Sequence, residues 1–144
     1  MKELINDYIK MTATEAVARL RSREISPLDL VEASIQRIEA VDSKVNALPI
    51  HCFEQARSQA KSFDYMAHSD NPKSLCGLPI GIKDYNDLGG ALTTYGSPIF
   101  SKNVVKKSDA TVRQLETNGA IGIAKSNVPE WAGGHTFNPV NGIT

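Results

Sequence analysis

Residues 77–84 read GLPIGIKD, a short apolar run that ends in a lysine and an aspartate. Alternate side chains of a strand point to opposite faces, so the two isoleucines share one face while Gly81 and Lys83 share the other. A lysine held among apolar residues must be paired or must lose its proton, and a neutral lysine is a competent general base. The run therefore predicts a strand over residues 80–83 that carries a candidate base, Lys83. The alternative is a lysine that emerges into water where the strand ends.

The sequence that follows predicts a strand, a helix and a second strand. Asp109 is suited to cap a short helix that Gly119 ends, and residues 120–124 form an apolar run typical of a buried strand. This order of elements indicates an α/β fold with a partly parallel sheet.

The first third of the chain predicts helices. Thr12 begins one candidate helix, and Ser26 followed by Pro27 begins a second. Apolar residues then recur at helical spacing from Phe53 to Ala67, which predicts a third helix. Apolar residues aligned along one face of a helix are typical of packing surfaces rather than of cofactor sites.

A polar stretch at residues 68–74 contains Asn-Pro and is typical of a loop. We place a boundary there. We expect residues 1–70 to form a helical N-terminal region and residues 71–144 to form the first part of an α/β core, both within one domain of a complete protein.

Several further short sequence motifs follow the GLPIGIKD run. They are residues 87–90 (DLGG), 93–97 (TTYGS), 108–111 (SDAT), 124–131 (AKSNVPEW) and 135–140 (HTFNPV). In order and spacing these motifs resemble the amidase signature family, and the resemblance extends over residues 10–144. It implies a single large α/β domain with a mixed central sheet enclosed by helices, of which this chain resembles the first portion.

The resemblance implies amide hydrolysis by a Ser–Ser–Lys triad, in which a nucleophilic serine attacks the carbonyl carbon and a second serine relays the proton. Lys83 matches the family's lysine by its Gly-Ile-Lys-Asp context. Both serines of the family lie in a Gly/Ser-rich segment that this sequence does not contain. Ser97, which stands in a Gly-Ser-Pro turn, is assigned a structural place. The 144-residue chain alone is therefore expected to be inactive.

The resemblance also bears on the substrate. It implies a linear amide cleaved to an acid plus ammonia or an amine, and the final motif resembles plain amidases more than amidotransferase subunits that act on charged transfer RNA. The small residues Ala132, Gly133 and Gly134 correspond to a segment near the family's substrate channel, so they are candidate substrate-binding residues, although a tight turn after Trp131 is the favoured alternative. Trp131 is expected in the core, and His135 is interpreted as structural or pocket-lining.

Composition excludes several other functions. Of 144 residues, 41% are hydrophobic and 22% charged, and 16 basic residues balance 16 acidic ones, so no electrostatic case for nucleic acid arises. No apolar stretch is long enough to cross a membrane, and the N-terminus lacks a signal-peptide core. Cys52 and Cys76 lack metal-ligand spacing, which favours a cytoplasmic protein with reduced thiols. No metal or cofactor is implied.

One near-match to a phosphate-binding loop runs from Gly119 to Ser126 (GAIGIAKS). The motif requires glycine where Ala124 stands, because the backbone must approach phosphate closely. The resemblance instead places Lys125 at the end of a core strand.

Two alternatives stay open at this point. The chain is a portion of an amidase that needs its missing C-terminal portion, or it is a non-catalytic paralogue or subunit that completes its fold with a partner chain. Two or three strands covered on one side leave a sheet edge and an apolar face open, so self-association is expected of residues 1–144 alone. The coding sequence beyond Thr144 would separate the two.

Overall fold

The computed structural model describes residues 7–68 and 70–144. Its helices are α2 (Ala13–Arg21), α3 (Pro27–Val45), α4 (Phe53–Lys61), α5 (Tyr65–His68) and α6 (Ala110–Thr117), with single 3₁₀ turns at Pro98–Phe100 and Glu130–Ala132. Its strands are β1 (Ile50–His51), β2 (Pro79–Lys83), β3 (Ile121–Ser126), β4 (Phe137–Asn138) and β5 (Gly142–Ile143).

The central sheet has the strand order β1-β3-β2. β2 pairs with β3 in parallel and β1 pairs with β3 in antiparallel fashion, so the sheet is mixed. α6 is the crossover that connects the two parallel strands, which confirms the strand, helix, strand order predicted from the sequence. The register shifts between Ile80 and Gly81, and beyond this irregularity Lys83 lies opposite Ser126.

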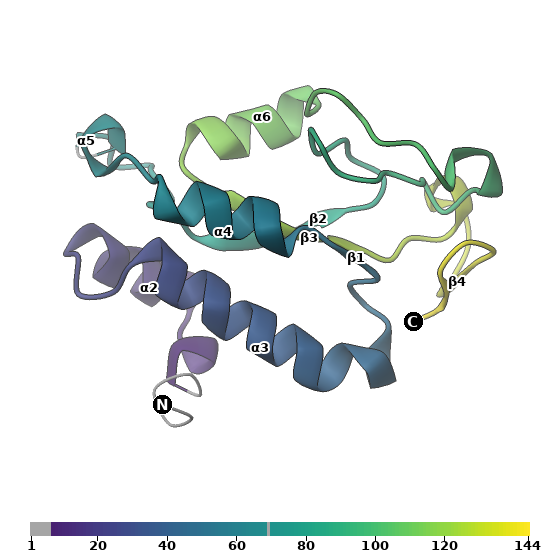
Figure 1. Cartoon of the computed structure of the whole chain (residues 1–144), viewed down its shortest axis with the longest axis horizontal. Coiled ribbons are helices and arrows are strands. Elements are labelled where there is room, and N and C mark those ends of the chain that lie inside the picture. The colour runs from purple at the N-terminus through teal and green to yellow at the C-terminus, as the bar shows by residue number, and fades with distance from the viewer. Residues whose placement is uncertain (1–6, 69) are drawn as a thin grey trace.

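The apolar residues of the sheet divide between two clusters. Ile121 and Ile123 of β3 pack with residues of α3 and α4, among them Val31 and Ala56. Ile82 of β2 packs instead in a second cluster that includes Val112 of α6. α3 and α6 accordingly lie on opposite sides of the sheet in Figure 1, so the central strand is covered on both faces.

The helix starts follow the predicted capping signals. Ser26 accepts from the N–H of Asp29 at 3.2 Å, and the Asp29 carboxylate accepts from the N–H of Ser26 at 2.8 Å, a complete capping box. Thr12 caps α2 and Asp109 caps α6 by one hydrogen bond each, accepting the N–H of Glu15 and of Val112. These side chains accept backbone N–H groups of the first turn that have no partner within the helix, and so they set where each helix begins.

The third predicted helix is shorter than its apolar pattern. α4 ends at Lys61, where Ser62 is the C-cap, and the prediction of a continuous helix to Ala67 is wrong. The carboxylate of Asp64 accepts from the N–H groups of Met66 and Ala67 and begins α5, a separate turn. Local hydrogen bonding by serine and aspartate thus ends the helix despite the continuing apolar spacing.

The N-terminal region takes part in the sheet. It supplies β1, and Arg57 of α4 donates to Glu32 of α3 at 2.7 and 3.0 Å, which ties together the two helices on this face. The division into residues 1–70 and 71–144 stays a prediction. The two-residue strands β1, β4 and β5 were not predicted, because such short segments carry no readable alternation.

One glycine brings two distant segments together. Gly96 has φ +68°, in the left-handed region, and a Cβ at this position would lie 2.7 Å from the carbonyl oxygen of Val128. Only glycine meets both constraints without strain. The turn at residues 93–97 therefore packs backbone against backbone on the chain that leaves β3.

We predict that Gly96→Ala lowers the free energy of unfolding by about 2 kcal/mol, because it combines a strained φ with a clash against backbone. Gly133→Ala is the matched control, since Gly133 has φ −99° and its Cβ would meet nothing closer than 3.7 Å. Urea unfolding of the full gene product measures both. Equal midpoints for the two variants would contradict the prediction.

Candidate functional site

The carboxyl ends of the two parallel strands form the candidate site. Lys83 is the last residue of β2 and lies opposite Ser126, the last residue of β3. In parallel sheets, residues at this edge face the loops that follow the strands. Here those loops are residues 84–97 and 127–144, which hold the polar groups described below.

Lys83 is exposed and the expectation of a buried lysine is wrong for this residue. Its Nζ lies 6.0 Å from the ring centroid of Tyr85, at the limit of a cation–π contact. The alternative prediction, a lysine that reaches solvent where the strand ends, matches the exposure of Lys83 in this chain. The strand alternation is nevertheless as predicted, with Ile82 buried and Gly81 and Lys83 exposed.

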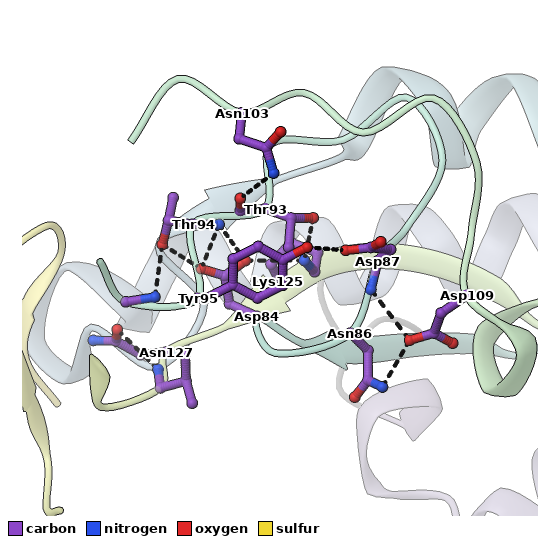
Figure 2. Close-up of polar contacts among 12 residues, drawn as sticks. Asp84, Asn86, Asp87, Thr93, Thr94, Tyr95, Asn103, Asp109, Lys125 and Asn127 are labelled. Carbon is purple, nitrogen blue, oxygen red and sulfur yellow. Dashed lines mark hydrogen bonds and ion pairs between the residues drawn. The ribbon is translucent and has the colours of Figure 1, made fainter. Parts of the chain in front are cut away.

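The buried lysine is Lys125, on the neighbouring strand. Its side chain and that of Asp84 both have 0% exposure, and Nζ lies 2.9 Å from Oδ1 of the carboxylate. Lys125 also donates to the hydroxyl of Thr93 at 2.9 Å. Figure 2 shows this pair between β3 and the turn at residues 93–97. The ion pair satisfies the rule that buried charges are paired.

Thr94 provides the other donors to Asp84. Its N–H donates to both carboxylate oxygens at 3.1 and 3.2 Å, and its hydroxyl donates to Oδ2 at 2.5 Å. The backbone of Asp84 is held as well: its N–H donates to the carbonyl of Ser126, and its carbonyl accepts from the N–H of Tyr95. The residue after Lys83 is thus fixed by its main chain and its side chain together.

A second polar group lies beside the first (Figure 2). The hydroxyl of Tyr95 donates to Asp87 at 2.6 Å, and this hydrogen bond, together with burial, raises the pKa of Tyr95 to about 12. Burial alone would raise the pKa of Asp109, but hydrogen bonds from the N–H of Val112 and from Asn86 outweigh it and lower that pKa. The loop after β2 is thereby tied to the start of α6.

Trp131 does not lie in the core, and this expectation is wrong. It is 50% exposed and stacks on Tyr95, with ring centroids 5.3 Å apart and an interplanar angle of 5°. Both residues have positive φ, 52° in each case, which is rare for bulky side chains. The N–H of Trp131 donates to the carbonyl of Tyr95 at 2.8 Å, so the stack joins the two loops at this edge.

A hollow of about 370 Å³ opens next to the end of β3. It is lined by Asn127, Val128, Pro129, Gly134, His135, Thr136, Asn138 and Thr144. All three predicted substrate-binding residues are exposed; Gly134 lines this hollow, and Ala132 and Gly133 do not. The lining position of His135 agrees with its interpretation as pocket-lining.

Asparagines hold the walls of the hollow. Asn138, 1% exposed, donates to the side chain of Asn127 at 2.6 Å and to the carbonyl of Val128 at 2.9 Å. Asn46, the C-cap of α3 with φ +54°, donates to the carbonyls of Asn141 and Ile143 at 2.7 and 2.8 Å. The last hairpin, β4–β5, is thus attached to the end of a helix near the start of the chain.

Ser97 lies in the turn where the sequence placed it. Its N–H donates to the carbonyl of Thr94 at 2.8 Å. Its side chain is fully buried, and within residues 7–68 and 70–144 its hydroxyl has no hydrogen-bond partner. Among the described residues, no ionisable side chain is hydrogen-bonded to this hydroxyl, so none of them is placed to activate it.

Among the described residues, no group of three or more His, Cys, Asp or Glu side chains could hold a metal ion. Within that same part of the chain, no helix has the length and apolar character needed to cross a bilayer.

Sequence reasoning missed Asp84, Thr94 and Lys125 as partners. The signal was present, because Lys125 ends an apolar run in the same way as Lys83. The sequence does not show which of the two strand ends is buried, because Lys83 and Lys125 have similar neighbours in sequence. Only the turn at residues 93–97, folded over β3, decides which lysine is enclosed.

Three known proteins illustrate what the chain is similar to. It is 35% identical over 125 residues to a glutamyl-tRNA(Gln) amidotransferase subunit from Psychrobacter cryohalolentis, covering 86% of this chain and 25% of the relative. It is 40% identical over 102 residues to the putative amidase AmiB2 of Mycobacterium bovis, covering 70% and 22%. The peptide amidase of Stenotrophomonas maltophilia shares the fold, with a TM-score of 0.81 over 95% of this chain and 30% of that one at 23% identity.

The chain thus spans about a quarter of the length of the curated relatives it matches. A family model described as Amidase matches residues 29–144, which include the sheet, the candidate edge and the hollow. The chain belongs to the amidase family.

Proposed function

We propose that the complete protein is an amide hydrolase that acts on a linear carboxylic amide, with Lys83 as its base. The observation that carries the proposal is the position of Lys83: exposed at the carboxyl edge of the sheet, directly before a residue fixed by main-chain and side-chain hydrogen bonds. A base needs such placement, because proton transfer requires a held and reachable group.

The proposed reaction proceeds through an acyl-enzyme. A serine oxygen attacks the amide carbonyl carbon while its proton passes, through a second serine, to the amine of Lys83. The tetrahedral intermediate then expels ammonia or an amine, which takes up the proton as the C–N bond breaks. Water attacks the resulting ester and releases the acid and the free serine. Backbone donors of a Gly-rich oxyanion hole would supply a large share of the rate.

The serines of this scheme lie outside the 144 residues. The sequence has no Gly/Ser-rich segment, so we propose that residues 1–144 alone are inactive and need a C-terminal portion or a partner chain to supply nucleophile, relay serine and oxyanion hole. We place this protein in the cytoplasm, acting on a small-molecule amide, without a role for nucleic acid or membrane.

For the substrate side we propose the hollow beside β3, with Gly134 in its wall and Ala132 and Gly133 in the adjoining exposed turn. Small side chains leave room for an acyl group there.

A second candidate function has a specific observation behind it. Relatives 34–37% identical to this chain, including those from Gluconobacter oxydans and Desulfatibacillum aliphaticivorans, are named as subunits of glutamyl-tRNA(Gln) amidotransferase. In a complex of that kind, the protein would release ammonia for transfer by a partner. The same Lys83 chemistry would serve both functions, whereas a non-catalytic paralogue would not use Lys83 at all.

We predict that Lys83→Ala in the full gene product lowers kcat by about 10²- to 10⁴-fold, the usual contribution of a general base. Ammonia release from a panel of primary amides, with glutamine included, measures this loss and separates the two candidate functions by substrate. Lys73→Ala is the matched control, because Lys73 is an exposed lysine in the loop before β2. Full activity of the Lys83→Ala variant, with its fold intact, would exclude the assigned role.

We also predict that residues 1–144 produced alone form dimers or larger species. Within the described residues β2 pairs only with β3, so one edge of β2 is open. An apolar groove of about 470 Å³, lined among others by Leu48, Leu78 and Ile80, lies between the sheet and the N-terminal helices. Sedimentation velocity and thermal unfolding test this. A monomer with one cooperative unfolding transition would be the opposite result and would mean that the chain needs neither remainder nor partner to fold.

A further inference from the structure

Half-exposed aromatic rings lie beside the proposed base. Tyr85, two residues after Lys83, is 47% exposed, and the centroid of its ring lies 6.0 Å from the Lys83 amine. Trp131, in the loop after β3, is 50% exposed. The ring of Tyr95 contacts both of these rings. Contiguous exposed apolar surface, unlike single scattered residues, marks sites of interaction.

The rings form one fixed cluster. Tyr85 meets Tyr95 edge-on at 6.3 Å between centroids, and Trp131 stacks on Tyr95 at 5.3 Å. Phe100 stands edge-on to both Tyr95 and Trp131, at 5.1 and 5.3 Å. The hydroxyl of Tyr95 is in turn held by Asp87 at 2.6 Å. Tyr85 is therefore the member of a supported cluster that reaches closest to the base, and a ring held in this way loses little further freedom when a ligand binds.

The backbone under the cluster is strained. Tyr95 and Trp131 both have φ 52°, and Ala132 has φ 57°, in the left-handed region that side chains other than glycine rarely adopt. Such conformations cost free energy and persist where the surrounding structure enforces them, commonly at functional sites. Here the N–H of Trp131 donates to the carbonyl of Tyr95, which joins the two strained loops. The strained backbone thus keeps the rings together at the edge where Lys83 stands.

The position of Tyr85 limits what its open ring can bind. In the proposed reaction the scissile carbonyl must lie close to the base, so the group attached to that carbonyl passes the ring of Tyr85. Aromatic pairs form with 4.5–7 Å between centroids, a range that a ring one carbon away from the carbonyl can reach. A charged acyl group would lose hydration there without gaining a partner. A flat, neutral, aromatic acyl group fits this position best.

We propose that Tyr85 is a specificity-determining residue, whose ring gives the enzyme a preference for amides with an aromatic acyl group. The proposal rests on the amide hydrolysis assigned above and names the class of substrate for the same site. Tyr85 takes no part in proton transfer. Its contribution is a supported aromatic face next to Lys83.

The test compares phenylacetamide with cyclohexylacetamide, two amides with the same carbon skeleton that differ in a flat and a puckered ring. The full gene product should favour the phenyl compound in kcat/KM. Tyr85→Leu should lower that preference by about 2- to 10-fold, the effect of losing one aromatic pair beyond its apolar area. Tyr85→Phe should retain the preference because it retains the ring.

Tyr65→Leu is the matched control. The ring of Tyr65 also has an edge-on neighbour, Phe63 at 5.2 Å, and a cation over its face, Arg23 at 5.2 Å. It belongs to α5, which lies at the opposite end of the molecule from β4 (Figure 1). This variant should leave the preference between the two amides unchanged.

An unchanged preference in Tyr85→Leu would overturn the inference, and two further measurements would show why. Equal losses of kcat for both amides would mean that the ring serves only the Lys83 amine. A lower melting temperature with normal kcat would mean that the rest of the protein, rather than substrate, covers the ring.

A second readout needs no turnover and so separates this inference from the proposed function. Phenylacetone and cyclohexylacetone carry a methyl group in place of the amide nitrogen and cannot be hydrolysed. In protein with isotope-labelled tyrosine, assigned through Tyr85→Phe, phenylacetone should shift the ring resonances of Tyr85 at lower concentration than cyclohexylacetone does. That result supports the aromatic subsite even if Lys83→Ala keeps full activity. Resonances of Tyr85 that neither ketone moves would overturn the inference while leaving Lys83 as the proposed base.

Discussion

The buried ion pair between Asp84 and Lys125 is the constraint on which the carboxyl edge of the sheet depends. It connects the end of β2 to β3, and through Thr93 and Thr94 it connects both strands to the turn that follows. Two enclosed charges are tolerable only while each keeps its partner and its hydrogen bonds, because losing one leaves the other buried and unpaired. Removing either partner is therefore expected to destabilise this edge of the sheet.

From this junction the polar contacts extend outward in two directions. One runs through Tyr95 to Asp87 and on to the start of α6, and the other runs through the Tyr95–Trp131 stack to the chain beyond β3. Each joins segments far apart in sequence without a long strand or helix between them. Such loops are ordered by side chains, which is where proteins commonly place their chemistry.

Much of the fold was predictable because its signals are local. The caps at Ser26 and Asp109, and the apolar runs that became β2 and β3, depend on neighbours a few residues away. The end of α4 was not predictable from periodicity, because Ser62 and Asp64 compete with the helix through their own hydrogen bonds. The site divides in the same way: Lys83 is proposed from its short motif alone, whereas the enclosure of Lys125 and the exposure of Trp131 depend on how distant loops fold over the sheet.

The asparagine that ends α3 has a further consequence for how this protein can change. Asn46 holds the last hairpin through Asn141 and Ile143, and its carbonyl accepts from Asn127 and Thr144, which line the hollow. The shape of that hollow is therefore set partly by the length of a helix that supplies none of its lining. Inserting or deleting one residue in α3 rotates its end by about 100°, and so a change far upstream would reshape the recess more than many substitutions inside it.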